Sequence, residues 1–427
     1  MSRARPDLDA VLSGNLCTGC GGCAAVAPDA VTMRMTTDGV LRPDTGGRPL
    51  PAPARDRIAA ICPGAGLTLE RGARPEHPLL GPYLRISAGH AIDPELRRAA
   101  SSGGVLSAML VHLLETGTVA RVWQTGPDPA RPIANRTVQS STAKEVKAAA
   151  GSRYAPSAPL EGIEDALTSG LRHAFVGKPC DIAALRALAR LDARVDATFP
   201  VMLSFFCAGV PSLNGARTVL SALGTSEAET ARFRYRGDGW PGYATATLRD
   251  GRAVRMNYAD SWGRILSRQV QHRCKLCPDG VGSFADIVCA DAWETDDRGY
   301  PVFEERDGLS AAIARTPLGA RLLRDAEIAG AIALSPLDPE ALVAMQPGQV
   351  RKRRSAAPRL AALRLARQPA PVFTGFHLWD NARRAGLRTG LREFLGTIRR
   401  AARRAIGRGR VPSTTARCSQ HLQHPSV

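Results

Sequence analysis

Residues 16–28 read LCTGCGGCAAVAP and place Cys17, Cys20 and Cys23 at intervals of three residues in one short stretch. Iron–sulfur clusters are held by cysteine thiolates, and three thiolates at this pitch can wrap one face of a cubane cluster. The intervening glycines favour this interpretation, because a residue without a Cβ adopts the positive φ of a tight loop and leaves backbone N–H groups free to approach sulfur. The stretch therefore predicts a 4Fe-4S site. Zinc binding, or three simply buried cysteines, is the alternative interpretation.

This cysteine run lacks a fourth ligand of its own. In the bacterial ferredoxin run a fourth cysteine follows after three residues, directly before a proline. Here Ala27 occupies that position, before Pro28, whereas the Cys-Pro pair recurs at Cys62 and Pro63. Cys62 is therefore the predicted fourth ligand, and residues 1–70 are predicted to form a small ferredoxin-like iron–sulfur module. Such a module buries little apolar surface, so the metal is expected to supply much of its folding energy.

The composition is that of a protein with an ordinary core. The 427 residues allow two or three domains, and 44% of them are apolar. No apolar run reaches the roughly 18–20 residues of a membrane span, and the N-terminus lacks the apolar core of a signal peptide. We therefore expect a cytoplasmic location, where the ten cysteines indicate metal or redox chemistry before disulfides.

The net charge of +18 is concentrated near the C-terminus. Residues 351–410 hold 17 Lys and Arg against two acids, a net charge of +15, so the rest of the chain is nearly neutral. We expect residues 351–427 to form an Arg-rich tail. Apolar residues recur every three to four positions over 383–406, which predicts a basic amphipathic helix. It suits an anionic membrane surface, at the inner membrane face, or an acidic partner. A helix packed on the body with a solvated Arg face is the alternative, and no motif indicates a nucleic-acid partner.

Two polar stretches flank predicted helices in the central part of the chain. Residues 71–85 are rich in Pro and Gly and are predicted to be a linker, followed by a strand over 84–90. Next comes an apolar-periodic helix, preceded by small residues that suit an anion site at a helix N-terminus, although an ordinary Ser N-cap explains them equally well. These small residues are Ser101, Ser102, Gly103 and Gly104.

A second helix is predicted to begin near residue 141. The sequence at its end suits contacts with a phosphate and a flat ring system, or an ordinary helix end. It reads Gly151, Ser152, Arg153 and Tyr154.

Two buried strands each end in a cysteine. The strand over 173–176 runs into Gly177, Lys178, Pro179 and Cys180, and the strand over 200–206 runs into Cys207. Sheets of α/β proteins bind ligands at the carboxyl ends of their strands. The alternative for either cysteine alone is a small buried hydrophobe.

A second Cys-x-x-Cys pair follows an alternating region. Residues 231–258 are predicted to hold two or three strands with a hairpin turn at Asp250-Gly251, and a helix over 261–272 leads to Cys274 and Cys277. A lone pair of this kind fits zinc, a redox pair or half of a cluster site. With Cys180 and Cys207 it predicts a second 4Fe-4S cluster. Cys289 lies within an apolar strand and is predicted to be inert core.

The ordered set of motifs resembles the coenzyme F-420 hydrogenase/dehydrogenase beta-subunit family, which includes ferredoxin-linked reductases of chlorophyll biosynthesis. The motifs are CTGCGGC, SSGG before a helix, GSRY, GKPCDIAAL, FCAGVPS and RCKLCPDG with ADI and DAW behind it. The resemblance runs from about residue 14 to residue 350. It implies FAD, one or two 4Fe-4S clusters and a mixed α/β flavin domain, here 84–350.

The resemblance assigns roles to residues of this chain. It implies that residues 101–104 bind the flavin with help from residues 151–154, that Lys178 lies near the flavin ring and stabilises its anionic reduced form, and that the four later cysteines hold a cluster. Ala27 departs from the many relatives that have a cysteine there, and the tail lies outside the shared motifs.

The predicted function is that of an FAD-dependent iron–sulfur oxidoreductase of mixed α/β fold. Ferredoxin or another redox protein is its expected partner, and an organic substrate or a reduced deazaflavin exchanges hydride at the flavin. The competing hypothesis is a non-catalytic zinc protein whose basic tail binds membrane or nucleic acid. The sequence names no substrate.

Overall fold

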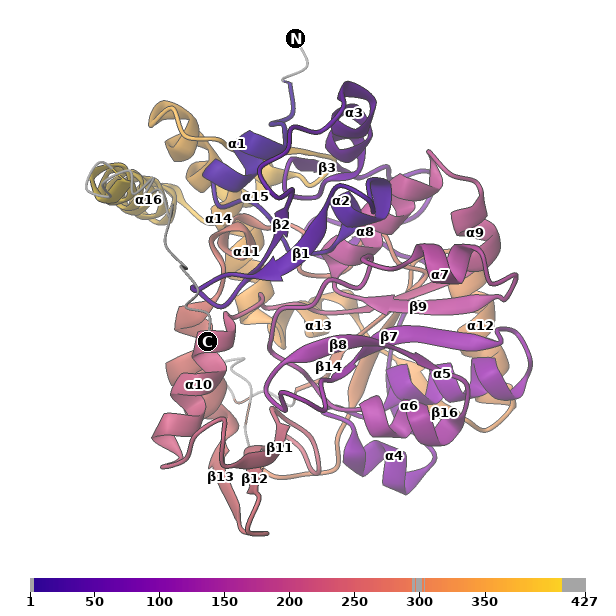
Figure 1. The fold of residues 1–427 in the computed structure, drawn as a ribbon. Coiled ribbons are helices and arrows are strands. Elements are labelled where there is room, and N and C mark those ends of the chain that lie inside the picture. The colour runs from indigo at the N-terminus through magenta and orange to yellow at the C-terminus, as the bar shows by residue number, and fades with distance from the viewer. Residues whose placement is uncertain (1–3, 294–295, 297–301, 303, 409–427) are drawn as a thin grey trace, which may run out of the picture.

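The computed structural model describes residues 4–293, 296, 302 and 304–408. Its centre is a mixed sheet of eight strands in the order β16-β6-β15-β14-β10-β9-β7-β8, shown in Figure 1. The strands are β6 (Arg85–Ala91), β7 (Arg121–Pro127), β8 (Asn135–Ser140), β9 (His173–Gly177), β10 (Val201–Phe205), β14 (Ile287–Asp291), β15 (Ser310–Ala314) and β16 (Ile332–Pro336). The four central strands β7, β9, β10 and β14 are parallel, whereas the pairs toward both edges are antiparallel. The prediction of a mixed α/β fold is thus confirmed.

Helices cover both faces of this sheet. The helices are α4 (Pro94–Ala99), α5 (Val105–Glu115), α6 (Ala143–Ala149), α7 (Glu164–Leu167), α8 (Pro179–Ala189), α9 (Arg194–Thr198), α12 (Pro317–Ile328) and α13 (Pro339–Ala344). Successive strand residues point to opposite faces, so Phe175 packs in the core beneath α8 while Val176 packs in the core beneath α5 and α12. The buried apolar runs that predicted strands at 173–176 and 200–206 are therefore strands covered on both sides.

The two or three strands predicted over 231–258 are a three-stranded sheet. Strands β11 (Thr230–Arg234), β12 (Tyr243–Leu248) and β13 (Ala253–Asn257) are antiparallel, and Gly251 takes φ 88° in the turn between the last two. The predicted helix over 261–272 is instead a π-helix, η1 (Ala259–Ile265), followed by a 3-10 turn, η2 (Leu266–Gln269). Helix α10 (Leu213–Ala222) packs against this region around Leu266.

The N-terminal cysteines lie on a small unit against α8. It contains α1 (Leu8–Ser13), α2 (Gly22–Val26), the hairpin β1 (Thr32–Met35) with β2 (Leu41–Asp44), α3 (Ala52–Ile61) and β3 (Gly66–Thr68). Helix α2 begins within the cysteine run, and α3 ends one residue before Cys62. The run and its remote partner are thus presented at the ends of two helices that pack together with α8 (Figure 1).

The prediction of a linker at 71–85 is wrong. Most of this segment is packed into the body, with short strands β4 (Glu76–His77) and β5 (Gly81–Pro82) and buried side chains at Leu79 and Leu80. Arginines far away in the sequence satisfy its carbonyl groups. Arg315 donates to the carbonyl oxygens of Leu80 (3.0 Å) and Pro82 (2.6 Å), and Arg353 donates to that of Leu79 (3.0 Å).

The segment expected to be a separate tail is largely part of the body. Helix α14 (Pro347–Leu365) crosses the expected boundary at residue 351 and buries Leu360 and Leu363. Strand β17 (Val372–Thr374) then pairs with β3 of the N-terminal unit. Helix α15 (Leu378–Arg384) follows, and α16 (Leu387–Arg408) is the predicted basic helix, separated from α15 by Gly386 at φ 81°. Cys418, which its position in the polar C-terminal segment predicts to be a free thiol, lies outside the described residues.

Candidate functional site

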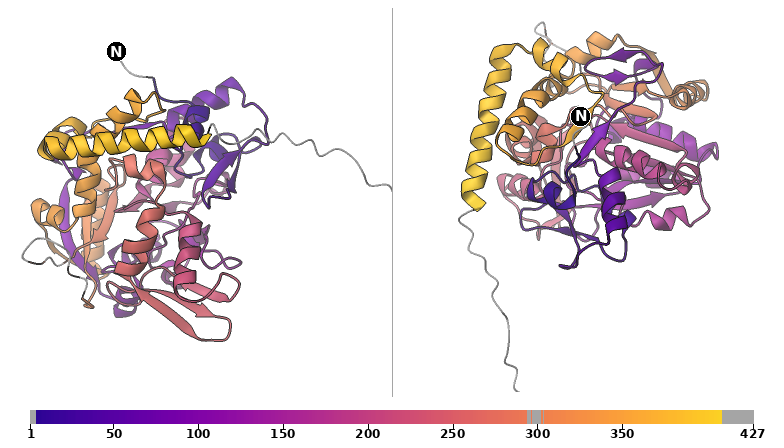
Figure 2. Two further views of the ribbon diagram at one scale, coloured as in Figure 1. Left: turned by 90° about the vertical axis from the view of Figure 1, so that its left-hand side faces the viewer. Right: turned by 90° about the horizontal axis from the view of Figure 1, so that it is seen from above.

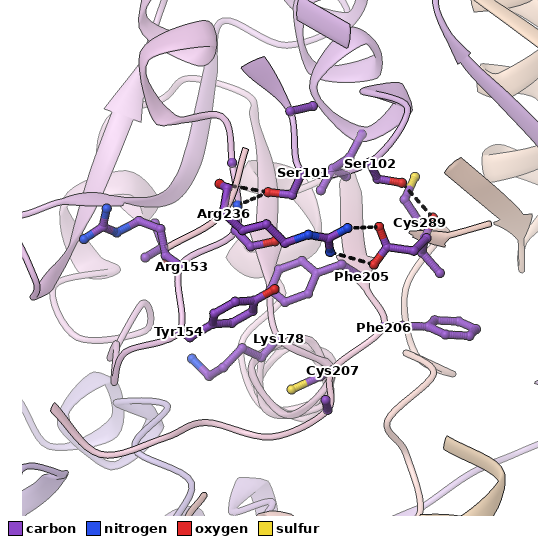
Figure 3. A pocket seen from close by; sticks show the side chains of 18 of the residues that line it. Ser101, Ser102, Arg153, Tyr154, Lys178, Phe205, Phe206, Cys207, Arg236 and Cys289 are labelled. Atoms are coloured by element: carbon purple, nitrogen blue, oxygen red, sulfur yellow. Dashed lines mark hydrogen bonds and ion pairs between the residues drawn. The ribbon is translucent and has the colours of Figure 1, made fainter. Parts of the chain in front are cut away.

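A cavity of about 310 Å³ opens at the carboxyl edge of the central sheet (Figure 3). The parallel strands all end at this edge, so the residues that follow β9, β10 and β14 meet there. The cavity is lined by the predicted cofactor residues Ser101, Ser102, Gly104, Gly151, Ser152, Arg153, Tyr154 and Lys178, and by Cys207. Gly103 is not among the lining residues and packs against Gly89 and Ser310. The structure thus brings together two stretches that the sequence separates by about fifty residues.

The two serines before α5 use their hydroxyls to fix loops. The Ser101 hydroxyl donates to the carbonyl oxygen of Arg236 (3.2 Å) and accepts from the N–H of Ser152, while the Ser102 hydroxyl donates to the carbonyl oxygen of Leu309 (2.9 Å). The first intrahelical bond of α5 joins Ala108 N–H to the Gly104 carbonyl (2.9 Å), so the preceding N–H groups face out of the helix end. At the N-terminus of α5 an anion would therefore be bound by backbone N–H groups and the helix dipole, and not by the serine hydroxyls.

Replacing Gly103 by Ala is expected to destabilise the protein by about 2 kcal/mol. A Cβ at this position would lie 2.6 Å from the backbone oxygen of Gly89 and 2.6 Å from the nitrogen of Ser310, so the loop must move away from the sheet. Denaturant unfolding measures the loss. The matched control is Gly390→Ala in α16, where no atom lies within 4 Å of the new Cβ and helix propensity predicts a gain of up to about 1 kcal/mol. Equal stabilities of the two variants would contradict the packing argument.

The stretch from Gly151 to Tyr154 lines the cavity with its backbone and one ring. Arg153 does not point into it: its guanidinium donates to the carbonyl oxygens of Ala134 (2.8 Å) and Pro132 (3.0 Å), away from the cavity in Figure 3. Tyr154 does lie along the cavity, with its ring centroid 4.8 Å from that of Trp262. The aromatic contribution expected here is present, whereas the arginine holds a neighbouring loop.

Lys178 is buried at the carboxyl end of β9. Its ammonium lies 2.7 Å from the Asp181 carboxylate and donates to the Ser157 hydroxyl at 2.8 Å. Burial lowers the pKa of Lys178. Asp181 and the nearby thiols of Cys180 and Cys207 together raise this pKa by a larger amount, so it lies above the ordinary value. A buried ion pair between Lys178 and Asp181 therefore stands beside the cavity.

An ion pair that the sequence does not reveal forms another wall of the cavity. Arg236 contacts both carboxylate oxygens of Asp291 (2.8 and 2.9 Å) and is 2% exposed. Its guanidinium lies 4.8 Å from the ring centroid of Tyr258 and 5.0 Å from that of Trp293. The sequence indicates Asp291 and Trp293 only as the end of a strand, and no pattern in 231–258 distinguishes Arg236 from the arginines around it.

The four N-terminal cysteines influence one another electrostatically. Burial raises the pKa of Cys20 to about 12, and Cys62 and Cys17 contribute to the increase. Burial likewise raises the pKa of Cys62 to about 11, with a contribution from Cys17, and places that of Cys23 well above its usual value, with contributions from the other three. Backbone N–H groups of Gly19 and Gly22 donate to the sulfur atoms of Cys17 (3.4 Å) and Cys20 (3.5 Å). We call this set the N-terminal thiol group.

The other four predicted ligands form a second such set, the central thiol group. Burial raises the pKa of Cys207 to about 11, and Cys274 and Cys277 add to this effect. Burial also raises the pKa of Cys180 well above its usual value, with contributions from Cys207 and Cys274. The N–H of Val210 donates to the Cys274 sulfur at 3.4 Å. The cysteines at the two strand ends thus lie near the Cys-x-x-Cys pair.

The two thiol groups are neighbours. Asp181 raises the pKa of both Cys20 and Cys180, which places it between the groups. Arg273, next to Cys274, donates to the carbonyl oxygen of Pro63 (2.7 Å), next to Cys62.

The donor chemistry fits two clusters of the Cys₄ type. Among the residues that the structure describes, however, no three His, Cys, Asp or Glu side chains are grouped as a site for a metal ion. The thiols are thus close enough to affect one another's charge without converging on one point. Cys289, which also lines the cavity, belongs to neither group, since burial alone raises its pKa to about 12.

Two family models match the chain. One describes the N-terminal part of the coenzyme F420 hydrogenase/dehydrogenase beta subunit and matches residues 86–164. The other describes the C-terminal part of the same beta subunit and matches residues 170–340. Together they cover more than half of the chain, including most of the residues that line the cavity and all of the central thiol group.

Curated relatives agree with these matches. The chain is 24% identical over 267 residues to the coenzyme F420 hydrogenase subunit beta of Methanothermobacter thermautotrophicus, which is 61% of this chain and 87% of the relative. It is 23% identical over 266 residues to the protein of the same name from Methanococcus voltae, 60% of this chain and 86% of the relative. A chain from the structure of the F420-reducing [NiFe] hydrogenase complex of Methanosarcina barkeri shares the fold, with a TM-score of 0.50 and 22% identity, over 66% of this chain and 96% of that one.

Proposed function

The chain belongs to the coenzyme F420 hydrogenase/dehydrogenase beta-subunit family, and on that premise we propose that it is an FAD-dependent iron–sulfur oxidoreductase. An oxidoreductase role follows from the family, whose curated members here are hydrogenase subunits. The proposal adds the cofactors, namely two 4Fe-4S clusters and FAD, and the residues that hold them.

The observation that carries the proposal is the continuity between thiols and cavity. Cys207 belongs to the central thiol group and also lines the cavity, and Lys178 beside the cavity responds electrostatically to Cys180 and Cys207. The N-terminal thiol group adjoins the central group through Asp181 and Arg273. This series of neighbouring sites suits the passage of electrons between a docked redox protein and an organic molecule at the cavity.

The proposed FAD site consists of two adjoining cavities. The second, also of about 310 Å³, shares residues 149–153 and Arg236 with the first. Two joined spaces suit a dinucleotide, whose phosphates would lie at the α5 N-terminus beside residues 101–104. Tyr154, Tyr258, Trp262 and Trp293 supply aromatic faces for its ring system. When bound, the flavin exchanges hydride with an organic partner and single electrons with iron–sulfur clusters.

Lys178 and the pair Arg236–Asp291 are proposed to set the charge of this site. Because Asp181 and the thiols keep Lys178 protonated, its ammonium favours negative charge developing on a ring beside it. Arg236, which is paired with Asp291, offers a guanidinium plane among aromatic rings. Each cation thus has a carboxylate partner, and the two walls differ in the group they present: an ammonium on one side and a guanidinium plane on the other.

The proposed organic partner is a deazaflavin such as coenzyme F420, which the names of the relatives contain. Ferredoxin or another redox protein is the proposed partner at the N-terminal unit.

The test is the composition of protein purified without oxygen. We expect flavin released on denaturation, a broad absorption shoulder near about 400 nm, and about eight irons per chain, at four per cluster. The metal must displace protons from buried thiols, because Cys20, Cys62 and Cys207 have raised pKa values; reconstitution in vitro is therefore expected to improve with rising pH. Zinc without flavin or sulfide would refute the proposal.

A further inference from the structure

Helix α16 (Leu387–Arg408) lies along the outside of the molecule and touches it with one face, as both views in Figure 2 show. Thr397 and Ala401 on this face are buried, and Glu393 makes an ion pair with Arg359 of α14 at 2.8 Å. Arg359 also donates to the carbonyl oxygen of Lys275 in α11 (His272–Leu276). The helix is therefore attached to the part of the body that carries Cys274.

A second face of α16 presents leucines to solvent. Leu387, Leu391 and Leu395 are 88%, 54% and 55% exposed and lie one helical turn apart. Ala402 continues the same face and is also exposed. Single exposed leucines are ordinary on protein surfaces, but three in register on one helix make an apolar stripe that the body leaves uncovered.

Arginines border this stripe. Arg388, Arg392, Arg399 and Arg403 are exposed on the adjacent side of the helix. Glu393 is the one acidic residue in α16, and its carboxylate faces Arg359 with only 15% of the side chain exposed. The outward surface of the described helix therefore combines leucine side chains with uncompensated positive charge.

We propose that the outward face of α16 docks on an anionic lipid surface. Charge complementarity selects this partner: long arginine side chains reach phosphate groups at the surface while the leucines enter the acyl boundary beneath. The stripe is bordered on its outer side by guanidinium groups, whereas the centre of an interface between two proteins is depleted of charge. None of the helices in the described ranges has the length and apolarity needed to cross a bilayer, so the contact is with the surface.

The docked helix lies near Cys274, because Arg359 of α14 contacts both Glu393 of α16 and the carbonyl oxygen of Lys275 in α11. The proposal nevertheless stands apart from the redox assignment. It requires only the packing and charge of α16 and applies equally if the bound metal is zinc.

Sedimentation with vesicles tests the proposal on the full-length protein as purified. We expect binding to vesicles of phosphatidylcholine with about one-third phosphatidylglycerol, little binding to pure phosphatidylcholine, and loss of binding between about 0.1 M and about 1 M salt as charges become screened. The triple variant Leu387→Ser, Leu391→Ser, Leu395→Ser is expected to bind at least about tenfold more weakly. Because these side chains are exposed, the variant is expected to keep the unfolding temperature and metal content of the wild type.

The matched control is Ile328→Ser in α12, an apolar residue that is 80% exposed on another part of the surface and should leave vesicle binding unchanged. Equal binding to both kinds of vesicle, or equal binding by the triple variant and the wild type, would overturn the proposal. A wild type that is dimeric by light scattering and becomes monomeric in the triple variant would also overturn it, because the stripe would then be an interface between two copies. Failure of the metal analysis above would leave all of these outcomes unaffected.

Discussion

The Cys62→Ser variant and the Cys274→Ser variant are each expected to contain about four irons per chain, whereas the wild type is expected to contain about eight. The two substitutions act on different thiol groups. Cys62 influences the pKa values of Cys20 and Cys23, whereas Cys274 influences those of Cys180 and Cys207. Loss of one thiolate from a group of four is expected to remove that cluster and leave the other. Iron and sulfide analysis of protein purified without oxygen measures the result.

The two variants should also differ in flavin. The Cys62→Ser protein is expected to retain it, because the N-terminal thiol group does not line the cavity. The Cys274→Ser protein is expected to lose part of its flavin. Cys274 and Cys207 belong to the same thiol group, and the loop that carries Cys207 forms one wall of the cavity. Cys289→Ser is the control for iron content, because this thiol is buried in β14 and belongs to neither group. Iron loss in the Cys289 variant similar to that in the other two would contradict the assignment of ligands.

The sequence was sufficient for features whose physical cause is local. Three cysteines among glycines, a Cys-Pro pair after a short helix, and two apolar strands that each end in a cysteine are visible in short windows. The strands could be placed in one sheet because continuous apolar runs indicate burial on both faces. Parallel strands present their carboxyl ends at one edge, so the meeting of Lys178 and Cys207 at a cavity follows from the same pattern.

Features that depend on distant partners were missed. Residues 71–85 have the composition of a linker, but Arg315 and Arg353, more than 230 residues away, satisfy their carbonyl groups and so permit burial. Helix α14 looks like part of a basic tail because arginines such as Arg353 are counted as solvated charges, yet Arg353 is 2% exposed. An arginine in the sequence therefore indicates a surface position only when the fold provides no buried carbonyl or carboxylate oxygen for its guanidinium group.

The partners of individual side chains in these motifs could not be predicted for a related reason. Ser101, Ser102 and Arg153 have the chemistry of a phosphate site, but their side chains bind backbone groups of other loops. In these segments the groups that remain available to bind an anion in the cavity are backbone N–H groups and glycines, and not the polar side chains. A short motif indicates which segments line the cavity, whereas the partner of each side chain is decided by the tertiary structure.

Removing the carboxylate of Asp291 is expected to have the largest effect on stability of any single change at the cavity. In the Asp291→Ala variant Arg236 would remain buried without its partner, and breaking one side of a buried pair costs about 3–5 kcal/mol. We expect a lower unfolding free energy in denaturant and loss of flavin during gel filtration. The control is Asp238→Asn, which removes the partner of Arg234 at an exposed position and should cost less than about 1 kcal/mol.

A double replacement separates stability from binding. The variant Arg236→Met with Asp291→Leu removes both charges, so it is expected to regain most of the stability lost in the single variant. It also removes the guanidinium that lies against Tyr258 and Trp293, and it should therefore still release flavin. Recovery of stability without recovery of flavin would show that the pair serves the site. Recovery of both would mean that the pair is needed only for folding and that the aromatic side chains hold the ring system by themselves.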